Sequence, residues 1–363
     1  MNRQRKIINR LCHQFKNDFF PITTKLDQDK VNEFQLSEFG TNSILSDIDF
    51  NNWLYSTPIS NERVFCLSGD EIVGQQSALQ SRLSIDGESI DCVCAINLIV
   101  KEEWRMKGLG VALTGDLINN HTLVVCLGVS DVAFRMFIRQ GWSDMGKTNC
   151  YIKPMKLKFV NDNTPFTNLY KNFRLTLALA LSKIIDFRYR IFSEQPSLNR
   201  VKNKADLDPN ILINNHQSNK IRFKRSLKYL AWRYFDIPSY RPYLLYTVNY
   251  KNKQLPGYLV VKISDYENKK ALVISDIEAH TQDMGQFIDA IVILATQKKT
   301  DIILYNGFNL ALEKILSTRQ FYQRPNGDIF VYYCNDDNIA NDLSKKENWI
   351  IKFSDSDMDF SYY

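Results

Sequence analysis

The segment 94–110 constrains the fold of this chain more than any other part of its sequence. Its first part is almost all apolar, which is typical of a strand buried on both faces. After a short polar link, Arg105-x-x-Gly108-x-Gly110 opens a stretch whose apolar spacing predicts a helix over 109–119. Glycines let the backbone approach a ligand closely and adopt conformations closed to other residues. The segment therefore predicts a strand, a turn suited to binding an anion, and a helix.

This turn differs from the common nucleotide-binding loops. No Lys-Ser or Lys-Thr pair follows Gly110, so it is not a Walker A loop. Leu113 stands where the dinucleotide fingerprint has its third glycine. The free amides at the start of the helix, with the charges of Arg105 and Lys107, favour a pyrophosphate. The alternative is an ordinary turn at the start of a helix.

The chain shows the same order of predicted elements twice. The first half begins with two predicted hairpins, over 64–75 and 82–100, and the second hairpin ends in the buried strand. A helix over 109–119, a strand over 123–127, a helix over 131–139 and a strand over 150–160 follow. In the second half the corresponding elements lie over 243–263, 271–277, 285–296, 301–305, 310–316 and 329–334. We interpret this order as a divergent internal repeat in an α/β protein, with chance similarity between two α/β segments as the alternative.

Between the halves the sequence predicts two further helices and a polar loop. An amphipathic helix is expected over 169–192 and another helix over 227–235, while 197–220 is polar and loop-like. The polar break at 161–165 favours a boundary there. The predicted divisions are 1–160, a helical linker 161–222, and 223–363.

The composition is that of a globular protein. Of the 363 residues, 44% are apolar and 24% charged. The seven cysteines are scattered and the four histidines dispersed, so we expect reduced thiols, no metal site and a cytoplasmic location. The N-terminus lacks the apolar core of a signal peptide, and the longest apolar run, near 175–185, is too short to span a bilayer. We therefore expect no membrane insertion.

The net charge of +6 is unevenly distributed. Residues 171–233 contain 14 basic and 4 acidic side chains, whereas 336–363 contain 3 basic and 7 acidic ones. The basic middle indicates an anionic partner, such as a cofactor phosphate or a nucleotide, and suggests that the acidic end folds against it. A solvated helix face is the alternative for the basic residues.

The strand ending at Val100 and the motif through Gly110 make the chain resemble the GNAT superfamily of acyl-CoA N-acyltransferases. The stretch 125–130 resembles the family's next strand and Gly141-Trp142 its Gly-Phe pair, so the resemblance covers about 45–160. It implies an α/β fold of two tandem GNAT-like domains, each with a mixed, mostly antiparallel central sheet flanked by helices, the second one degenerate. It also implies acyl-CoA as the cofactor, bound by Leu98, Val100, Arg105, Met106, Lys107, Gly108, Leu109, Gly110 and Ser130.

The resemblance assigns different tasks to the two halves. Residues 1–160 correspond to the acyl-CoA-binding domain. In the second half the equivalent turn, 281–287, has a single glycine and acidic residues nearby, which would repel a pyrophosphate. Residues 223–363 are therefore expected to bind the acceptor or to support the first domain.

The chemistry of the family needs an oxyanion donor and a base. The resemblance places the backbone N–H of Leu98 where the thioester oxygen is stabilised. The glutamate base of histone-type members is replaced by Cys94, and the tyrosine acid of many members by Phe137. Another carboxylate must then take the proton of the amine. The candidates are Asp355, Asp357 and Asp359 at alternate positions of the C-terminal segment, unless that segment is a frayed, solvated terminus, or else Asp276, Glu278 and His280.

The whole chain resembles two-domain GNAT proteins of bacterial surface-polysaccharide pathways, through 229–233, Pro238, Tyr240 and 349–359. This predicts transfer of an acyl group from acyl-CoA to the amine of a nucleotide-linked amino sugar. The residues expected at the acceptor are Arg233, Tyr240, Asp276 and Glu278. Two alternatives remain open: a peptidoglycan-bridge-type transferase that uses aminoacyl-tRNA, and a non-catalytic binding protein with a decayed acyltransferase fold. The main hypothesis expects no nucleic-acid partner and leaves a homo-oligomer open.

Overall fold

The computed structural model describes most of the chain. The described residues are 3–15, 18–21, 28–41, 43–55, 61–85, 87–156, 180, 194–213, 220–238, 243–325 and 327–361. Tyr240 and, apart from Ala180, the helix predicted over 169–192 lie outside these residues.

The first half contains helices and strands in nearly the predicted order. Its elements are α1 Arg3–Phe15, β1 Phe19–Pro21, α2 Gln28–Phe39, α3 Ile48–Tyr55, β2 Glu62–Ser68, β3 Glu71–Ile85, β4 Glu88–Val100, α4 Leu109–Asn120, β5 Leu123–Leu127, α5 Asp131–Gln140, β6 Ser143–Lys147 and β7 Asn149–Pro154.

The second half repeats that order and ends in a short strand followed by two 3₁₀ turns. Its elements are β8 Ser197–Val201, β9 Ile221–Phe223, α8 Leu227–Tyr234, β10 Leu244–Tyr250, β11 Lys253–Gln254, β12 Gly257–Tyr266, β13 Lys269–Ala279, α9 Met284–Gln297, β14 Ile302–Phe308, α10 Leu310–Thr318, β15 Tyr322–Arg324, β16 Ile329–Cys334, α11 Asp337–Leu343 and β17 Trp349–Lys352. The turns are Phe353–Asp355 and Met358–Ser361.

The strands form a large, mostly antiparallel sheet with two parts, in agreement with the predicted fold class. The first part runs β1–β2–β3–β4–β5–β16–β6, and the second runs β8–β10–β12–β13–β14–β7–β15. Strand β17 joins the two parts, because it pairs with β14 of the second part and with β9, which in turn pairs with β3 of the first part. Among the described strands, the parallel pairs are β4–β5, β13–β14 and β9–β17. The rest of the sheet is antiparallel.

The two halves exchange a strand, which the sequence order did not predict. Strand β7 of the first half lies between β14 and β15, with Ile152 opposite both Leu304 and Tyr322. Strand β16 of the second half lies between β5 and β6, with Val331 opposite Cys126. The divisions 1–160, 161–222 and 223–363 remain a prediction. A unit cut at these boundaries would, however, lack one strand of its own sheet.

Strand β8 corrects the prediction of a loop over 197–220. It pairs antiparallel with β10, and its residues are half-buried or exposed. The polar composition of Ser197–Val201 is therefore that of an edge strand, whose outer face meets solvent. Such a strand carries too few apolar residues to produce a periodic sequence signal.

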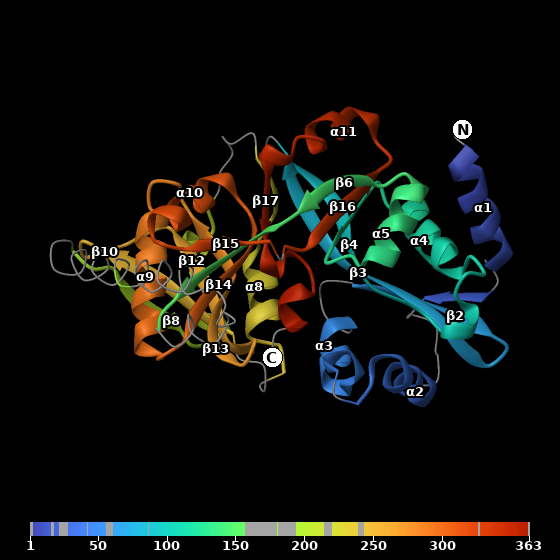
Figure 1. Ribbon diagram of the computed structural model, residues 1–363, viewed down its shortest axis with the longest axis horizontal. Coiled ribbons are helices and arrows are strands. Elements are labelled where there is room, and N and C mark those ends of the chain that lie inside the picture. Colours follow the sequence, from blue (N-terminus) through green and yellow to red (C-terminus); the bar gives the residue numbers. More distant parts are fainter. Residues whose placement is uncertain are drawn as a thin grey trace, which may run out of the picture.

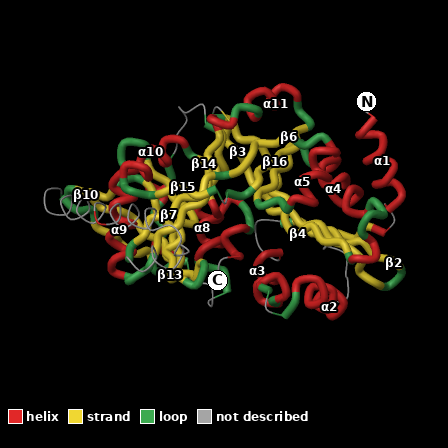
Figure 2. Tube along the Cα trace, in the orientation of Figure 1, coloured by secondary structure: helices red, strands yellow, loops and turns green. Residues whose placement is uncertain are grey.

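The helices enclose the two parts of the sheet from outside (Figures 1 and 2). Helices α1, α4 and α5 cover the first part, and α9 and α10 cover the second. Helices α3 and α8 lie between them and are joined by two stacked indoles, Trp53 and Trp232, at 4.8 Å and 13°. Each indole N–H donates to the other residue's carbonyl, at 3.0 and 3.4 Å. The C-terminal turns pack in this central layer, where Phe360 meets Trp53 and Phe50.

Candidate active site

The predicted anion-binding turn adopts the expected strand–turn–helix geometry. Gly108 precedes α4 with φ +89°, in the left-handed region that favours glycine. In α4 the backbone hydrogen bonds begin at Ala112, whose N–H donates to the carbonyl of Gly108 at 3.0 Å. The amides before it therefore point out of the helix start, as an anion site requires. A side chain at Gly108 would meet Leu11 of α1 at 2.9 Å.

The side chains of the turn present charge to solvent. Arg105 and Lys107 are exposed, as is Met106, which has φ +64°. The Nε of Arg105 donates to the carbonyl of Val100 at 3.0 Å, which ties the turn to the end of β4. Leu109 is fully buried, so only its backbone can meet a ligand. The turn can therefore offer two cations and backbone donors to one anionic group.

Strand β4 separates from β5 next to this turn. Their register contains only Val93 opposite Val124 and Cys94 opposite Val125, after which the strands diverge. Beyond this point β4 carries a bulge, because Asn97 and Leu98 have no partner in the register with β3. Asn97 has φ +51°, a left-handed conformation. The bulge therefore lies just beyond the last residue pair of β4 and β5.

The same separation occurs in the second half, but there the C-terminal segment fills it. Strands β13 and β14 pair from Ala271 opposite Ile302 to Ile274 opposite Tyr305. Beyond this register β14 pairs with β17 instead. The turn Phe353–Asp355, which follows β17, packs against β13 and β14. The second half therefore uses its gap to hold the protein's own tail.

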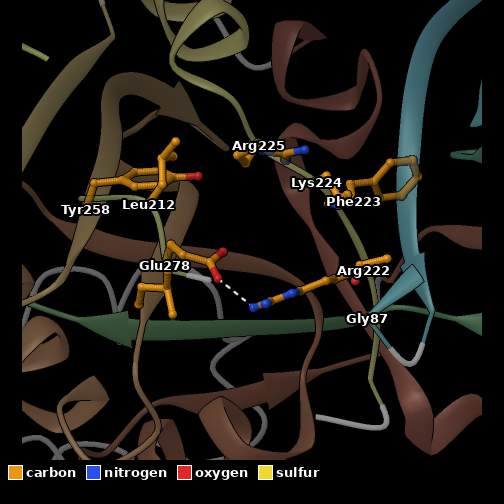
Figure 3. A pocket seen from close by; sticks show the side chains of 10 residues that line it. Gly87, Leu212, Arg222, Phe223, Lys224, Arg225, Tyr258 and Glu278 are labelled. Carbon is orange, nitrogen blue, oxygen red and sulfur yellow. Dashed lines mark hydrogen bonds and ion pairs between the residues drawn. The ribbon is translucent and has the colours of Figure 1, made fainter. Parts of the chain in front are cut away.

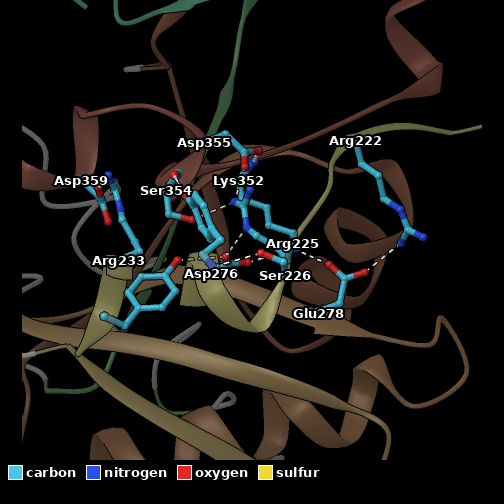
Figure 4. A network of polar contacts seen from close by, with 12 residues as sticks. Arg222, Arg225, Ser226, Arg233, Asp276, Glu278, Lys352, Ser354, Asp355 and Asp359 are labelled. Atoms are coloured by element: carbon cyan, nitrogen blue, oxygen red, sulfur yellow. Dashed lines mark hydrogen bonds and ion pairs between the residues drawn. The ribbon is translucent and has the colours of Figure 1, made fainter. Parts of the chain in front are cut away.

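Two of the tail carboxylates form buried ion pairs (Figure 4). Asp355 pairs with Arg225, which also binds Asp276 at 2.9 Å. Asp359 pairs with Arg233 at 2.5 Å and accepts a hydrogen bond from Tyr243 at 2.9 Å. Because the charges are compensated, these contacts anchor the tail rather than leave carboxylates free for chemistry.

The third carboxylate, Asp357, has a different environment. It is half-buried, and within the described chain it has no ion-pair partner. Burial is the main cause that raises its pKa from 3.8 to about 6, with its own backbone N–H and Arg233 acting in the opposite direction. Burial raises the pKa of Cys126, and the negative charge of Asp357 raises it further. Asp357 therefore lies near the gap between β4 and β5.

The neighbouring residue fixes this position. Met358 packs directly on Gly128, which follows β5, so closely that a Cβ on Gly128 would lie 2.0 Å from the Met358 sulfur. Gly128 has φ +82° and donates its N–H to the carbonyl of Ile329 at 2.9 Å. The tail is thus held against the end of β5 in the first half of the chain.

Comparisons with known proteins agree with this geometry. No protein-family model and no curated protein matches the chain. Among solved structures, a probable N-acyltransferase of Enterococcus faecalis and a GCN5-related N-acetyltransferase of Kribbella flavida each match at a TM-score of 0.58, with 11% and 12% identity, over 87% of this chain and 72% of theirs. An N-myristoyltransferase of Saccharomyces cerevisiae with bound myristoyl-CoA matches at 0.55, with 13% identity, over 87% of this chain and 82% of its own. This is the fold of the GCN5-related N-acetyltransferases.

Within this fold most of the predicted cofactor residues lie at the end of β4 and in the turn that follows it. Leu98 and Val100 are half-buried at the end of β4, and Arg105 to Gly110 form the adjoining turn. Ser130 is exposed beyond the end of β5, where its Oγ caps α5 by accepting from Ala133 N–H at 3.3 Å. Their contact with a cofactor remains a prediction.

Arg233 is buried, in contrast to its predicted place at the acceptor, and Phe137 makes a core contact. Phe137 is buried and stacks on Trp142 at 4.5 Å and 14°, which is a core contact. Arg233 is fully buried and also donates to the carbonyl of Ser356 at 2.7 Å. A side chain closed off in this way holds the tail and cannot reach a substrate in this conformation. Asp276 is equally buried between Arg225 and Lys352.

Glu278 lines two cavities, of which the smaller also borders Ser84 and Gly87 of the first half. It accepts from Arg222 at 2.8 Å, and this pair stands between a cavity of about 80 Å³ (Figure 3) and one of about 360 Å³. The larger cavity lies at the ends of β13 and β14 and is bordered by the cationic side chains of Lys220, Arg222, Lys314 and Lys352. Its remaining lining is mostly apolar, with Glu278 and Glu347 as the acidic members.

Metal and membrane sites are not indicated within the described residues. No group of three or more His, Cys, Asp or Glu side chains there is placed to hold a metal ion. No helix in this part of the chain is long and apolar enough to cross a membrane.

The sequence did not single out three polar residues beside the bulge of β4. Arg63 on β2 and Gln75 and Gln76 on β3 are buried, and both glutamines donate to bulge carbonyls: Gln75 to Asn97 at 3.3 Å and Gln76 to Ile96 at 2.9 Å. The available signal was a pair of successive carboxamides, Gln75 and Gln76, in the part of β3 that is continuously buried.

Proposed function

We propose that the chain is an acyl-CoA-dependent N-acyltransferase. The turn from Arg105 to Gly110 would hold the pyrophosphate of acyl-CoA, and Asp357 would accept the proton of the acceptor amine. One observation carries the proposal: Asp357, which has no ion-pair partner among the described residues, lies next to Met358, which packs at the end of β5 beside the β4–β5 gap. The position of the usual glutamate base holds Cys94, whose pKa burial raises well above its ordinary value, so this thiol stays protonated.

The residues divide the chemistry between them. Acyl-CoA supplies an activated acyl carbon as a thioester. The N–H of Leu98, at the bulge, would donate to the carbonyl oxygen as it gains negative charge. The C–N bond that forms replaces the C–S bond, whose electron pair leaves with sulfur. Asp357 takes the proton from nitrogen and passes it to water.

The pKa of Asp357 suits this task. A carboxyl with a pKa of about 6 is mostly ionised near pH 7, and it is a stronger base than an ordinary aspartate. It can also attract an alkylammonium group before deprotonation, because burial weakens the screening of its charge. Asp355 lacks this freedom, since Arg225 occupies it.

For the acceptor we propose the amine of a nucleotide-linked amino sugar. The cavity of about 360 Å³ on the second half supports an acceptor with an anionic part, because four cationic side chains border a mostly apolar floor. Lys314, which is exposed, and Lys220, which is half-buried, could bind a diphosphate, and a base or sugar could cover apolar surface. Arg222 and Glu278 would then contact the acceptor.

Binding and turnover test the proposal separately. Calorimetry with CoA, acetyl-CoA and myristoyl-CoA should detect binding of at least one acyl-CoA, and a thiol-release assay should then screen nucleoside-diphosphate amino sugars. Asp357→Asn should keep acyl-CoA binding and lose roughly a hundredfold in kcat, the effect expected for loss of a general base. Asp265→Asn, at an exposed position on β12, is the matched control.

Two results would contradict the proposal. Failure of every acyl-CoA to bind the wild type would favour a donor other than CoA or a non-catalytic protein. Full activity of Asp357→Asn would remove the aspartate from the mechanism and leave Glu278 and His280 as the carboxylate and imidazole to examine.

A further inference from the structure

Arg63 is a buried cation without an acidic partner. It is 3% exposed and, within the described chain, forms no ion pair with a carboxylate. Burial lowers the pKa of its guanidinium below the ordinary value. The guanidinium carbon lies 4.6 Å from the ring centres of both Tyr55 and Phe65. A buried charge without a carboxylate partner among the described residues lowers the stability of the fold.

The hydrogen bonds of Arg63 lead to the bulge of β4. Its Nε and Nη2 both donate to Oε1 of Gln75, at 3.2 and 2.9 Å. The Nε2 of Gln75 donates in turn to the carbonyl of Asn97 at 3.3 Å. The carboxamide orientation follows from these partners, because its oxygen faces two donors and its nitrogen faces an acceptor. The chain of bonds therefore runs from a cation through one amide to a peptide of the bulge.

That peptide contains the proposed oxyanion donor. The carbonyl of Asn97 and the N–H of Leu98 belong to the same planar, conjugated group. Donation to the carbonyl draws electron density from the nitrogen, so the N–H becomes a stronger donor. A guanidinium at the start of the chain of bonds increases this effect, since charge-assisted hydrogen bonds are stronger than neutral ones.

The surroundings hold the peptide in place. The Nδ2 of Asn97 donates to the hydroxyl of Tyr55 at 3.3 Å, and that hydroxyl donates to Oγ of Ser77 at 2.9 Å. The left-handed conformation of Asn97 is one that a non-glycine residue adopts at a cost. The hydrogen bond that the Asn97 carbonyl accepts from Gln75 and the one that the Asn97 side chain donates to Tyr55 compensate for this cost.

We propose that Arg63, acting through Gln75, is a positioning residue that orients and polarises the Asn97–Leu98 peptide as the oxyanion donor. The inference rests on the proposed function, because it concerns the same thioester oxygen. The neutral partners of Arg63 have a purpose on this view. A carboxylate beside the guanidinium would cancel its field at the bulge.

The decisive variant is Gln75→Glu. Glutamate has the same shape, still accepts both bonds from Arg63 and gives the buried guanidinium an ion-pair partner, so the fold should be retained. It removes the donor to Asn97 and neutralises the cation. If Arg63 and Gln75 only stabilise the structure, Gln75→Glu should have the same kcat as the wild type. If they polarise the peptide, it should lose activity.

The polarisation of the thioester carbonyl can be measured by infrared difference spectroscopy with carbonyl-¹³C-labelled acetyl-CoA or myristoyl-CoA, whichever binds. The wild type should shift the carbonyl band of the bound thioester to lower wavenumber. Gln75→Glu and Arg63→Met should lose most of that shift while the calorimetric Kd changes by less than about threefold. Arg63→Lys should keep part of the shift, because it keeps the charge, and kcat should follow the same order with a fall of roughly tenfold for Gln75→Glu.

An unchanged carbonyl shift in Gln75→Glu would overturn the inference and leave the proposed function intact. If neither acyl-CoA bound the wild type, the proposed function itself would fail, so the two failures are distinguishable. Should Arg63→Met not fold, Gln75→Glu and Arg63→Lys still decide the question, because the first gives the guanidinium an ion-pair partner and the second keeps the charge of the wild type.

Discussion

At the scale of single residues, the three tail aspartates show how environment separates identical side chains. Asp355 and Asp359 are each paired with an arginine, whereas Asp357 has none among the described residues. Desolvation without compensation raises the pKa of an acid, and Asp357 shows this effect. A buried carboxylate of this kind lowers the stability of the fold, and carboxylates with a raised pKa are typical of functional sites.

The pH dependence of stability tests this reading of Asp357. Folding raises the pKa of this carboxyl from 3.8 to about 6, so the folded chain binds the proton more tightly than the unfolded chain. Stability from this group is therefore full below the lower pKa and is lost as the pH rises through the higher one. We expect Asp357→Asn to melt at a higher temperature than the wild type at about pH 8, with no advantage at about pH 4.

Circular dichroism melts across that pH range would provide the measurement, with Asp265→Asn as the exposed control. A lower melting temperature of Asp357→Asn at the alkaline end would show that the carboxylate has a stabilising partner. The role of a free base would then be excluded.

Substitutions at the two glycines of the anion-binding turn should affect acyl-CoA affinity differently. A side chain at Gly108 meets both a φ of +89° and Leu11 at 2.9 Å, whereas one at Gly110 meets Met136 and Val100 only at ordinary distances of 3.5 and 3.8 Å. We expect Gly108→Val to distort the turn and reduce acyl-CoA affinity at least tenfold in calorimetry, through strain of about 1–2 kcal/mol together with displacement of α1. Gly110→Ala should bind normally. Equal affinity in both variants would show that the turn does not contact the ligand.

At the scale of elements, local pattern predicted most helices and strands but not their partners. The helix over 109–119 and the strand over 123–127 follow from apolar spacing in a short window, and both are present. The pairing of β7 with β14 joins residues such as Ile152 and Leu304, for which no local signal exists. Edge strand β8 was missed because it is polar.

The candidate site was predictable to a similar extent. The turn at Gly108 carries its chemistry in consecutive residues, so sequence alone located it. The choice between Asp355 and Asp357 depends on Arg225 and Arg233, which lie far away along the chain. The contact from Arg63 to Gln75 is also between two strands and is visible only once β2 and β3 are paired.

The docking of the tail depends on its buried ion pairs, and the Arg233–Asp359 pair can be tested against an exposed one. Both side chains of this pair are 0% exposed, so Arg233→Leu leaves a buried carboxylate without compensation. We expect a loss of about 3–5 kcal/mol in the free energy of unfolding. Arg82→Leu breaks a 2.7 Å pair with Asp91 whose side chains are 67% and 79% exposed, and should cost less than about 1 kcal/mol.

Denaturant titration of both variants gives the comparison, and the double variant Arg233→Leu with Asp359→Leu should regain most of the loss because no charge stays buried. If Arg233→Leu and Arg82→Leu lowered the free energy of unfolding equally, the tail would not be docked as described. The same pairs make truncation before Ser354 an unsuitable test of catalysis, since it leaves Arg225 and Arg233 buried and without their tail partners.

At the scale of the whole molecule, the exchanged strands make the two halves dependent on each other. Without β16, strands β5 and β6 each lose a neighbour, and without β7 the same is true of β14 and β15. An unpaired strand edge inside a sheet exposes both its backbone groups and the apolar residues around it. The chain should therefore unfold as one cooperative unit, although its sequence suggests two consecutive domains.

Fragments provide the test of this dependence. Residues 1–160 and 161–363, expressed separately, should each aggregate or lack a cooperative melting transition, because each sheet misses a central strand that the other fragment carries. Co-expression should restore a complex with acyl-CoA affinity close to that of the intact chain, and the intact chain should show a single transition in denaturant by both fluorescence and circular dichroism. A fragment 1–160 that melts cooperatively on its own would show that β5 and β6 can pair without β16. In that case the first half would be an independent domain, and the exchange would serve only to fix the second half, with its tail, against the gap between β4 and β5.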